Sequence, residues 1–350
     1  MGGFRGLPAG LRSRHCTRWR RGQAGMAVIS VLVVVAVVAV MAAALMARQA
    51  TAIHAAQAEQ TLVQARWLLR GEISRAQVVL RAEAQREPST RLDGLWSRPI
   101  TGKVVGSLDG EPARVFSEII DEQSKFNLRN LLTADEVDPT EAATFLRLCT
   151  LVGVPPEQAR HIVRRVVVSL VAAERRVEAA GSPSPARIER QAQARAVATQ
   201  LGLPQPLPSQ EEAPRLRTLD DLLSDHGIEH AAIERLRPYA TILPIRTRIN
   251  ANTTGPEVLA AGVPGLPLER ARALVQTRDR GQWFLNRGDI INRLQMRETL
   301  DPAELRVGVT SRWFRVSSAL RTPHTTVLMQ ALLHDNKESL PEVVWLREGA

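Results

Sequence analysis

Two histidines, His226 and His230, stand four residues apart, the spacing that lets two imidazoles on one helix bind the same metal ion. Gly227 follows the first of them and weakens the helix that would have to aim both side chains. The surrounding sequence offers no third ligand. We therefore do not expect zinc at this pair, and the sequence predicts no metal site and no cofactor.

Other reactive residue types lack the partners that catalysis needs. The chain has no glycine-rich phosphate loop ending in Gly-Lys, no Gly-x-Ser-x-Gly turn and no His-Glu-x-x-His helix. Two acid pairs, Asp121-Glu122 and Asp220-Asp221, stand at a predicted end of a strand and at a predicted helix start, where carboxylates have structural roles. The sequence therefore indicates that the protein is not an enzyme.

One glycine-containing turn is also compatible with a different function, the binding of nucleic acid. Residues 260–266 stand between two expected helices and have the outline of a helix-hairpin-helix, a unit that often binds nucleic acid. Backbone amides of such a turn can meet phosphate, and nearby arginines can add salt-dependent attraction. The arginines in question are Arg270, Arg272, Arg278 and Arg280. Pro264 removes one amide and acids interleave the arginines, so we interpret the unit as a packing hairpin and expect no nucleic-acid partner. A membrane-anchored DNA-binding protein of a DNA-uptake system stays as the alternative.

The peptide bond between Gly25 and Met26 joins two segments of opposite character. Residues 1–25 contain no acid and six arginines, which are Arg5, Arg12, Arg14, Arg18, Arg20 and Arg21. The 22 residues from Met26 to Ala47 are uncharged, and at about 1.5 Å per residue they span roughly 33 Å, close to the thickness of a bilayer core. The positive-inside rule keeps the leader in the cytoplasm. The sequence therefore predicts a single-pass membrane protein.

The same segment has two other interpretations. One is a secretory signal peptide cleaved near Ala42-Ala43-Ala44, but its apolar core would be longer than the usual 7 to 15 residues or so. The other is an uncleaved anchor in which Gly25 has no role. The sequence that follows is informative, because residues 26–87 contain no proline and only one glycine, Gly71. This predicts one continuous helix, amphipathic in its second half and ended by Pro88.

A basic leader ending in glycine, an apolar start and one long helix together resemble the type IV pilin and pseudopilin family. The resemblance implies that a prepilin peptidase cleaves after Gly25 and that the new amine of Met26 is methylated. Ser30 then holds the fifth mature position, where most of the family has a glutamate that pairs with the amine of the subunit ahead. A carboxylate in the membrane is costly unless it is paired. A subunit without it needs no neighbour ahead, which suits a filament tip.

Three later segments resemble one branch of this family, the K-type minor pseudopilin of the type II secretion system (GspK). They are Phe116–Leu132 with its Asp-Glu, Phe-Asn-Leu and Asn-Leu groups, the Asn-rich Ile249–Ala260, and Ser311–Val316. The resemblance implies a structural subunit at the tip of the pseudopilus, which initiates assembly and supports export of folded proteins across the outer membrane. It implies as partners the I-type and J-type minor pseudopilins, the major pseudopilin, prepilin peptidase and inner-membrane lipid. Secreted substrates and the outer-membrane secretin remain open as further partners.

Some K-type pseudopilins bind calcium through an acidic loop in the first helical region. Calcium takes about six to eight oxygen ligands, several of them carboxylates. Where that loop's aspartates are expected, this chain has Arg164-Arg165-Val166-Val167-Val168. The resemblance therefore carries no calcium site over to this sequence.

Charge and cysteine content agree with an exported protein. The formal net charge is +10, but the six leader arginines account for most of it, so the mature chain carries +4. Cys16 lies in the leader and Cys149 is the only other cysteine, so the mature chain cannot form an internal disulfide. The mature fold must be held by packing.

The resemblance and the local patterns together predict an α+β protein. We expect a type IV pilin-like fold, with a long N-terminal transmembrane helix and an antiparallel sheet, interrupted by a large, mainly helical insertion containing SAM-like or helix-hairpin-helix units. Short apolar runs separated by turns predict strands over 100–105, 113–120, 313–316, 325–333 and 343–345. Apolar residues at helical spacing predict helices over 140–152, 157–176 and 218–239. Residues 181–185 and 204–214 are expected to be loops. The expected parts are a leader 1–25, a helix 26–90 with its span at 26–47, a sheet from 91–120 and 307–350, and helical regions 121–243 and 244–306.

Overall fold

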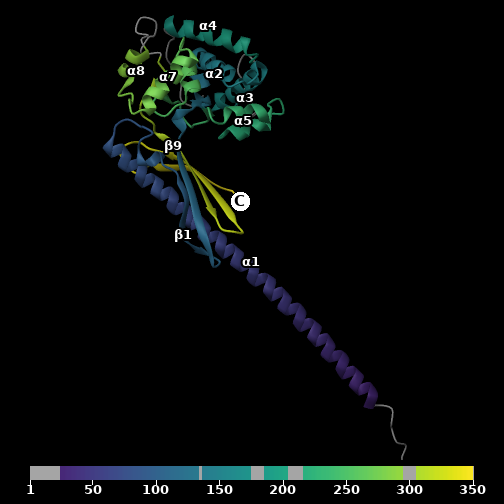
Figure 1. Ribbon diagram of the computed structural model, residues 1–350. Coiled ribbons are helices and arrows are strands. Elements are labelled where there is room, and N and C mark those ends of the chain that lie inside the picture. The colour runs from purple at the N-terminus through teal and green to yellow at the C-terminus, as the bar shows by residue number, and fades with distance from the viewer. Residues whose placement is uncertain (1–23, 134–135, 175–184, 204–215, 295–304, 350) are drawn as a thin grey trace, which may run out of the picture. The chain divides into compact units, whose positions relative to one another are not determined.

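The computed structural model describes residues 24–133, 136–174, 185–203, 216–294 and 305–349 (Figure 1). The chain divides into two compact units, residues 1–62 and residues 63–350, and each is described by itself. The second unit contains an antiparallel sheet and a group of short helices, which Figure 1 shows gathered at the end of the sheet where β9 begins.

The first helix, α1, runs from Ala24 to Arg86, which confirms the prediction of one uninterrupted helix. The helical hydrogen bonds continue to the Glu87 amide, which donates to the Glu83 carbonyl at 2.9 Å. Pro88 then ends the helical hydrogen-bond pattern, because proline has no backbone N–H. Within the second unit, one side of the helix is buried through a stripe of apolar residues at helical spacing. The stripe consists of Ala65, Leu69, Ile73, Ala76 and Leu80.

The sheet is antiparallel and has the strand order β1-β2-β9-β10-β11. Its strands are β1 (Ile100–Leu108), β2 (Glu111–Asp121), β9 (Trp313–Arg321), β10 (Thr326–His334) and β11 (Glu342–Gly349). These strands confirm the predicted strand regions, although β1, β2, β9 and β11 extend beyond the predicted limits. The central pair joins distant sequence, because Ser117 on β2 lies opposite Ser318 on β9.

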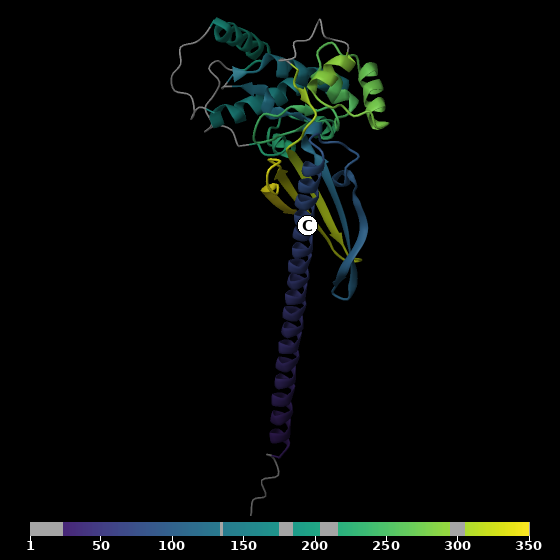
Figure 2. The ribbon, with the colours of Figure 1, turned by 90° about the vertical axis from the view of Figure 1, so that its left-hand side faces the viewer.

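The end of α1 lies beside the last strands of the sheet (Figure 2). Gln77 Nε2 donates to the Pro341 carbonyl at 2.6 Å, and Arg81 Nη1 donates to the Lys337 carbonyl at 2.7 Å. Near the end of β11, Arg66 Nε lies 2.9 Å from a Glu348 carboxylate oxygen. The second half of α1 therefore lies along the strands that come last in the sequence.

The insertion between β2 and β9 is mainly helical. Its α-helices are α2 (Pro139–Leu151), α3 (Pro156–Glu174), α4 (Pro185–Gln200), α5 (His230–Leu236), α6 (Pro256–Gly262), α7 (Leu268–Asp279) and α8 (Arg287–Leu294). Short 3-10 turns cover η1 (Leu95–Ser97), before the sheet, and within the insertion η2 (Glu122–Ser124), η3 (Leu128–Leu131) and η5 (Leu219–Ser224). One hydrophobic core runs through the insertion and contains the fully buried rings of Phe126, Phe145 and Phe284.

The described part of the chain also contains three pairs of short strands. β3 (Phe126–Asn127) runs parallel to β6 (Ala240–Thr241), and β7 (Ile249–Asn250) runs parallel to β8 (Val307–Gly308). β4 (Leu132–Thr133) and β5 (Glu136–Val137) form an antiparallel pair. Each parallel pair brings together segments more than 50 residues apart, so these short strands set the path of the chain.

The predicted helix over 140–152 is confirmed by α2, and the one predicted over 157–176 is confirmed by α3 up to residue 174, where the described residues end. The prediction of one helical group over 218–239 is correct only in part, because a 3-10 turn and a short α-helix are separated by residues 225–229. The sequence interpretation also did not anticipate α4, which begins at Pro185. The loop expected at 181–185 is wrong at Pro185, which is the first residue of α4, while residues 181–184 and the loop expected at 204–214 lie outside the described residues.

Candidate functional site

The apolar part of α1 is the first candidate site. Every large apolar side chain described between Met26 and Met46 is exposed, in a helix whose most apolar 18-residue window has a mean hydropathy of 3.1. By length and composition this helix is suited to cross a membrane. The exposed apolar surface is consistent with a membrane anchor.

The residues proposed for processing lie at the start of this helix. Gly25 falls in the first turn of α1, and Met26 beside it is 72% exposed. Ser30 is also exposed on the helix. The arginines of the leader precede residue 24 and lie outside the described residues.

A second candidate is the buried carboxylate of Asp121, the last residue of β2. One of its oxygens accepts hydrogen bonds from Ser311 Oγ and Thr253 Oγ1, each at 2.5 Å, and from Asn250 Nδ2 at 3.2 Å. Its other oxygen accepts from the backbone amide of Gln123 at 2.8 Å. Burial raises the pKa of Asp121, while these hydrogen bonds oppose that rise. Asp121 therefore joins the sheet to both ends of the insertion.

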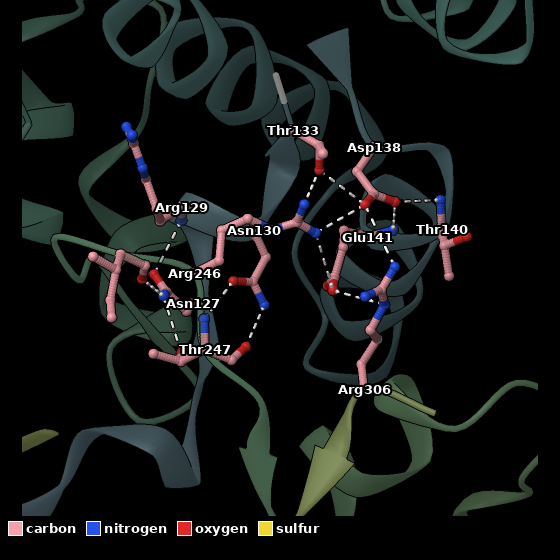
Figure 3. A network of polar contacts seen from close by, with 11 residues as sticks. Asn127, Arg129, Asn130, Thr133, Asp138, Thr140, Glu141, Arg246, Thr247 and Arg306 are labelled. Carbon is pink, nitrogen blue, oxygen red and sulfur yellow. Dashed lines mark hydrogen bonds and ion pairs between the residues drawn. The ribbon is translucent and has the colours of Figure 1, made fainter. Parts of the chain in front are cut away.

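Two asparagines join the start of the insertion to residues 243–247 (Figure 3). Asn127 Oδ1 accepts from the Leu243 amide at 3.1 Å, and its Nδ2 donates to the Ile245 carbonyl at 2.8 Å. Asn130 bonds both backbone groups of Thr247, at 3.0 Å to the amide and 2.8 Å to the carbonyl. An amide side chain offers both a donor and an acceptor, so each asparagine can replace a strand neighbour. The asparagines of the Phe-Asn-Leu and Asn-Leu groups therefore have a structural role, because they connect these two segments by hydrogen bonds.

Beside them lies a cluster of buried charges around the start of α2 (Figure 3). Asp138 caps the helix, since its Oδ1 accepts from the amides of Thr140 and Glu141 at 3.1 and 3.2 Å. Arg246 donates to Asp138 Oδ2 at 2.8 Å and to the hydroxyl of Thr133. Arg306 holds Glu141 at 3.6 Å through its Nε. The side chain of Glu141 is only 3% exposed, so two arginines face an almost fully buried carboxyl group.

Burial raises the pKa of Glu141 from its ordinary 4.5 to about 7. The carboxylate of Asp138 acts in the same direction, while Arg246, Arg306 and a hydrogen bond from Asn130 oppose the rise. Glu141 therefore changes its charge close to neutral pH.

We expect the free energy of unfolding to fall as the pH rises from 4.5 to about 7 and then to level off. The folded protein holds the Glu141 proton more tightly than the unfolded chain, so ionisation above pH 4.5 favours unfolding. A pKa difference of this size corresponds to about 3 kcal/mol. Urea unfolding at pH 5 and pH 8 measures it, and Glu141→Gln should remove most of the difference. An unchanged pH dependence in this variant, matching that of exposed Glu118→Gln, would contradict the assignment.

Two of the four arginines considered for phosphate binding, Arg278 and Arg272, have partners within the protein. Arg278 is buried, and its Nη1 donates to the carbonyls of Ala251 at 2.9 Å and Thr254 at 2.6 Å. Arg272 pairs with Glu269 at 2.6 Å on the surface of α7. Gly265 takes φ = +75° in the turn between α6 and α7, a conformation that favours glycine.

The other candidate residues have structural partners. Asp221 closes a capping box with Thr218 at the start of η5, and Asp220 pairs with Arg237 at 2.6 Å. His230 lies 3.8 Å from Glu234. Burial raises the pKa of the Cys149 thiol to about 12, so it stays protonated. Among the described residues, no group of three or more His, Cys, Asp or Glu side chains could hold a metal ion.

Sequence reasoning missed the charged cluster of Arg246, Arg306 and Glu141. Arg246 stands in a mixed segment between Ile245 and Thr247, and Arg306 stands immediately before Val307. Glu141 stands in the first turn of a helix, where an acid has an ordinary explanation. The alternation in residues 245–249 was the available signal, because it places Arg246 and Arg248 on one side of an extended segment. Nothing local indicated that Arg306 would lie beside them.

Comparison with known proteins gives matches over the same regions. Two profiles described as type II secretion system (T2SS), protein K match residues 124–245 and 249–310, together more than half of the chain. Type II secretion system protein K of Pectobacterium carotovorum subsp. carotovorum is 30% identical over 139 residues, which are 37% of this chain. That match spans 41% of the relative's own length, so it covers less than half of that protein.

A solved structure shares the fold. The crystal structure of the GspK-GspI-GspJ complex from the enterotoxigenic Escherichia coli type 2 secretion system includes a chain that matches with a TM-score of 0.60. The match covers 84% of this chain and 98% of that chain, at 19% sequence identity. At this identity the likeness shows a common α+β fold with a long N-terminal helix and an antiparallel sheet.

Proposed function

Because the chain belongs to the type II secretion system protein K family, we propose that it is the minor pseudopilin at the tip of a type II secretion pseudopilus. There it initiates assembly and supports export of folded proteins across the outer membrane. The observation that carries this proposal is the joint presence of the family's insertion and an exposed apolar helix at the N-terminus. The protein acts as a structural subunit and not as an enzyme.

In this proposal residues 26–47 cross the inner membrane once, and the bulk of the chain lies in the periplasm. The apolar helix packs with the helices of other minor pseudopilins, where lipid leaves van der Waals contact as the main attraction. The bulky insertion blocks addition of a further subunit ahead. Prepilin peptidase cleaves the leader after Gly25, and the new amine of Met26 is methylated.

The proposed partners are the I-type and J-type minor pseudopilins and, below them, the major pseudopilin. The solved relative is a complex of GspK with GspI and GspJ, which supports the first two by analogy. Prepilin peptidase and inner-membrane lipid are partners during maturation. Secreted substrates and the outer-membrane secretin are further partners that this proposal leaves open.

Residues 244–306 are proposed to contain a SAM-like or helix-hairpin-helix unit that serves in packing. Support comes from the internal bonds of Arg278 to the segment that precedes α6. A hairpin that binds DNA needs its arginines and turn amides at the surface. The alternative function is a DNA-binding protein of an uptake system. Because Arg278 is buried, one of the four arginines considered for that function is not at the surface.

We expect the full-length mature protein, purified in a neutral detergent, to form a complex with its I-type and J-type partners. Gel filtration of the mixture should show the three proteins eluting together and earlier than any one alone. Fluorescence anisotropy with duplex DNA at physiological salt should show no binding. Micromolar DNA binding that weakens steeply with salt, without complex formation, would favour the alternative.

Ser30→Glu is expected to leave secretion unchanged or slightly reduced, without producing subunits along the shaft. A charge at the centre of a membrane helix costs about 2.5 to 3.5 kcal/mol, and less near the interface, where residue 30 is proposed to lie. At the tip, a glutamate finds no amine ahead of it that would offset this cost. Crosslinking from position 30 in cells reports the neighbours. Repeated contacts with the major pseudopilin on both sides would overturn the tip position.

A further inference from the structure

Three arginines lie on one side of the short parallel pair formed by β7 and β8. Ile249 lies opposite Val307 in this pair, and both side chains are buried. Arg248 and Arg306 immediately precede them, so alternation along the strands turns both arginines away from that core. Arg246 stands two residues before Arg248, and its guanidinium reaches the same region.

The three guanidinium groups line a surface pocket of about 300 Å³. Its remaining lining residues are Asn130, Glu141 and Thr247. Polar groups therefore surround it, and a buried carboxyl group forms part of its wall. This composition suits a small charged group better than an apolar side chain.

The positive charge in the pocket is only partly balanced. Asp138 pairs with Arg246 at 2.8 Å and more distantly with Arg306 at 3.8 Å, and it accepts hydrogen bonds from the amides at the start of α2. Glu141 lies 3.6 Å from Arg306 Nε, beyond hydrogen-bond distance, and 4.0 Å from Arg246. Among the described residues, the exposed side chain of Arg248 has no hydrogen-bond or ion-pair partner.

The excess of positive charge also affects the neighbouring guanidinium group of Arg287. Burial lowers the pKa of Arg287, and the positive charges of Arg248 and Arg306 lower it further. In addition, Arg306 Nε is buried without a hydrogen bond to any described residue. A buried donor of this kind costs free energy until an acceptor reaches it.

We propose that this pocket is a binding site for a carboxylate, held between the guanidinium groups of Arg248 and Arg306. The planar fork of a guanidinium matches the two oxygens of a carboxylate, which makes such contacts strong and directional. Arg246 contributes positive charge from behind while it remains bonded to Asp138. The source of the carboxylate is either a free small acid or an acidic side chain of a peptide segment.

Glu141 gives this site a defined dependence on pH. The charged and polar groups that face it are Asp138, Arg246, Arg306 and Asn130. Ionised Glu141 repels an incoming carboxylate and competes for Arg306, so binding favours its protonated form. The dissociation constant is therefore expected to rise as the pH increases from 7 to 8, by at most tenfold per pH unit for one linked proton.

The test is isothermal titration calorimetry on the full chain in neutral detergent, at fixed ionic strength. The probes are citrate, a short peptide with acetyl and amide ends and three glutamates, and inorganic phosphate. We expect saturable binding of citrate or the peptide at pH 6, weaker binding at pH 8, and proton uptake near pH 7. Binding of citrate alone identifies a free acid as the source, and binding of the peptide alone identifies a protein segment. Saturable binding of phosphate only, or of no probe, overturns the proposal.

Three variants locate the site. Arg248→Gln removes an exposed group, so the fold should be kept while the dissociation constant rises about tenfold or more. Arg160→Gln changes a half-exposed arginine on α3 outside the pocket, controls for the loss of one charge and should bind as the original protein does. Glu141→Gln should bind at pH 8 as tightly as at pH 6. Equal binding by the Arg248 and Arg160 variants, or an unchanged pH dependence in the Glu141 variant, contradicts the assignment.

Discussion

Replacing Gly25 by leucine is expected to leave the leader attached and to abolish secretion. The proposed cleavage site lies where the basic leader meets the apolar helix, and a bulky side chain should exclude the bond from the peptidase. Six arginines then stay joined to residues that must pack among other helices in the membrane. Moving even one such charge toward the bilayer centre costs about 2.5 to 3.5 kcal/mol, so the uncleaved subunit should not enter a filament. Intact mass and N-terminal sequencing report cleavage, and a secretion assay reports function.

Gly22→Leu is the matched control, because it makes the same substitution within the leader. It should be processed normally, with Met26 as the first residue of the mature protein. A mature protein that begins near Arg48 or Gln49 would contradict the pseudopilin interpretation. The chain would then behave as a conventional secreted protein.

Asp121→Ala should lower the free energy of unfolding by about 3 to 5 kcal/mol, a large part of a typical domain's total. Its carboxylate accepts from four donors: the nearby amide of Gln123, and three side chains from two distant segments, residues 250–253 and Ser311. Removing it leaves buried polar groups of Asn250, Thr253 and Ser311 without this acceptor. Asp121→Asn keeps the shape but replaces one acceptor oxygen by a donor, so the loss should be smaller.

The measurement is urea unfolding of the purified protein, with protease resistance as a second readout. Glu118→Ala is the control on the same strand, because its side chain is exposed, and its effect should stay within about 0.5 kcal/mol. An Asp121→Ala variant as stable as this control would show that the hydrogen bonds contribute little. The connection of the sheet to its insertion would then rest on apolar packing.

Local patterns were sufficient for the elements that depend on near neighbours in the sequence. The continuous helix α1 follows from a long segment without proline, and the strands follow from short apolar runs between turns. The start of η5 after Thr218 follows from the acids in its first turn, which act within a few positions. The Gly25–Met26 junction was likewise found from charge and hydropathy alone, and its cleavage remains a prediction.

Tertiary structure decided which distant residues meet. The asparagines of the Phe-Asn-Leu and Asn-Leu groups were found as a motif, but the backbone of residues 243–247 as their partner was not. Arg278 read as a surface arginine and is buried, because α7 packs against the segment before α6. Arg306 joins Arg246 and Arg248 only because β8 pairs with β7. Such pairings depend on burial and on closing long loops, whose free energies are set by the whole fold and leave no local periodicity in the sequence.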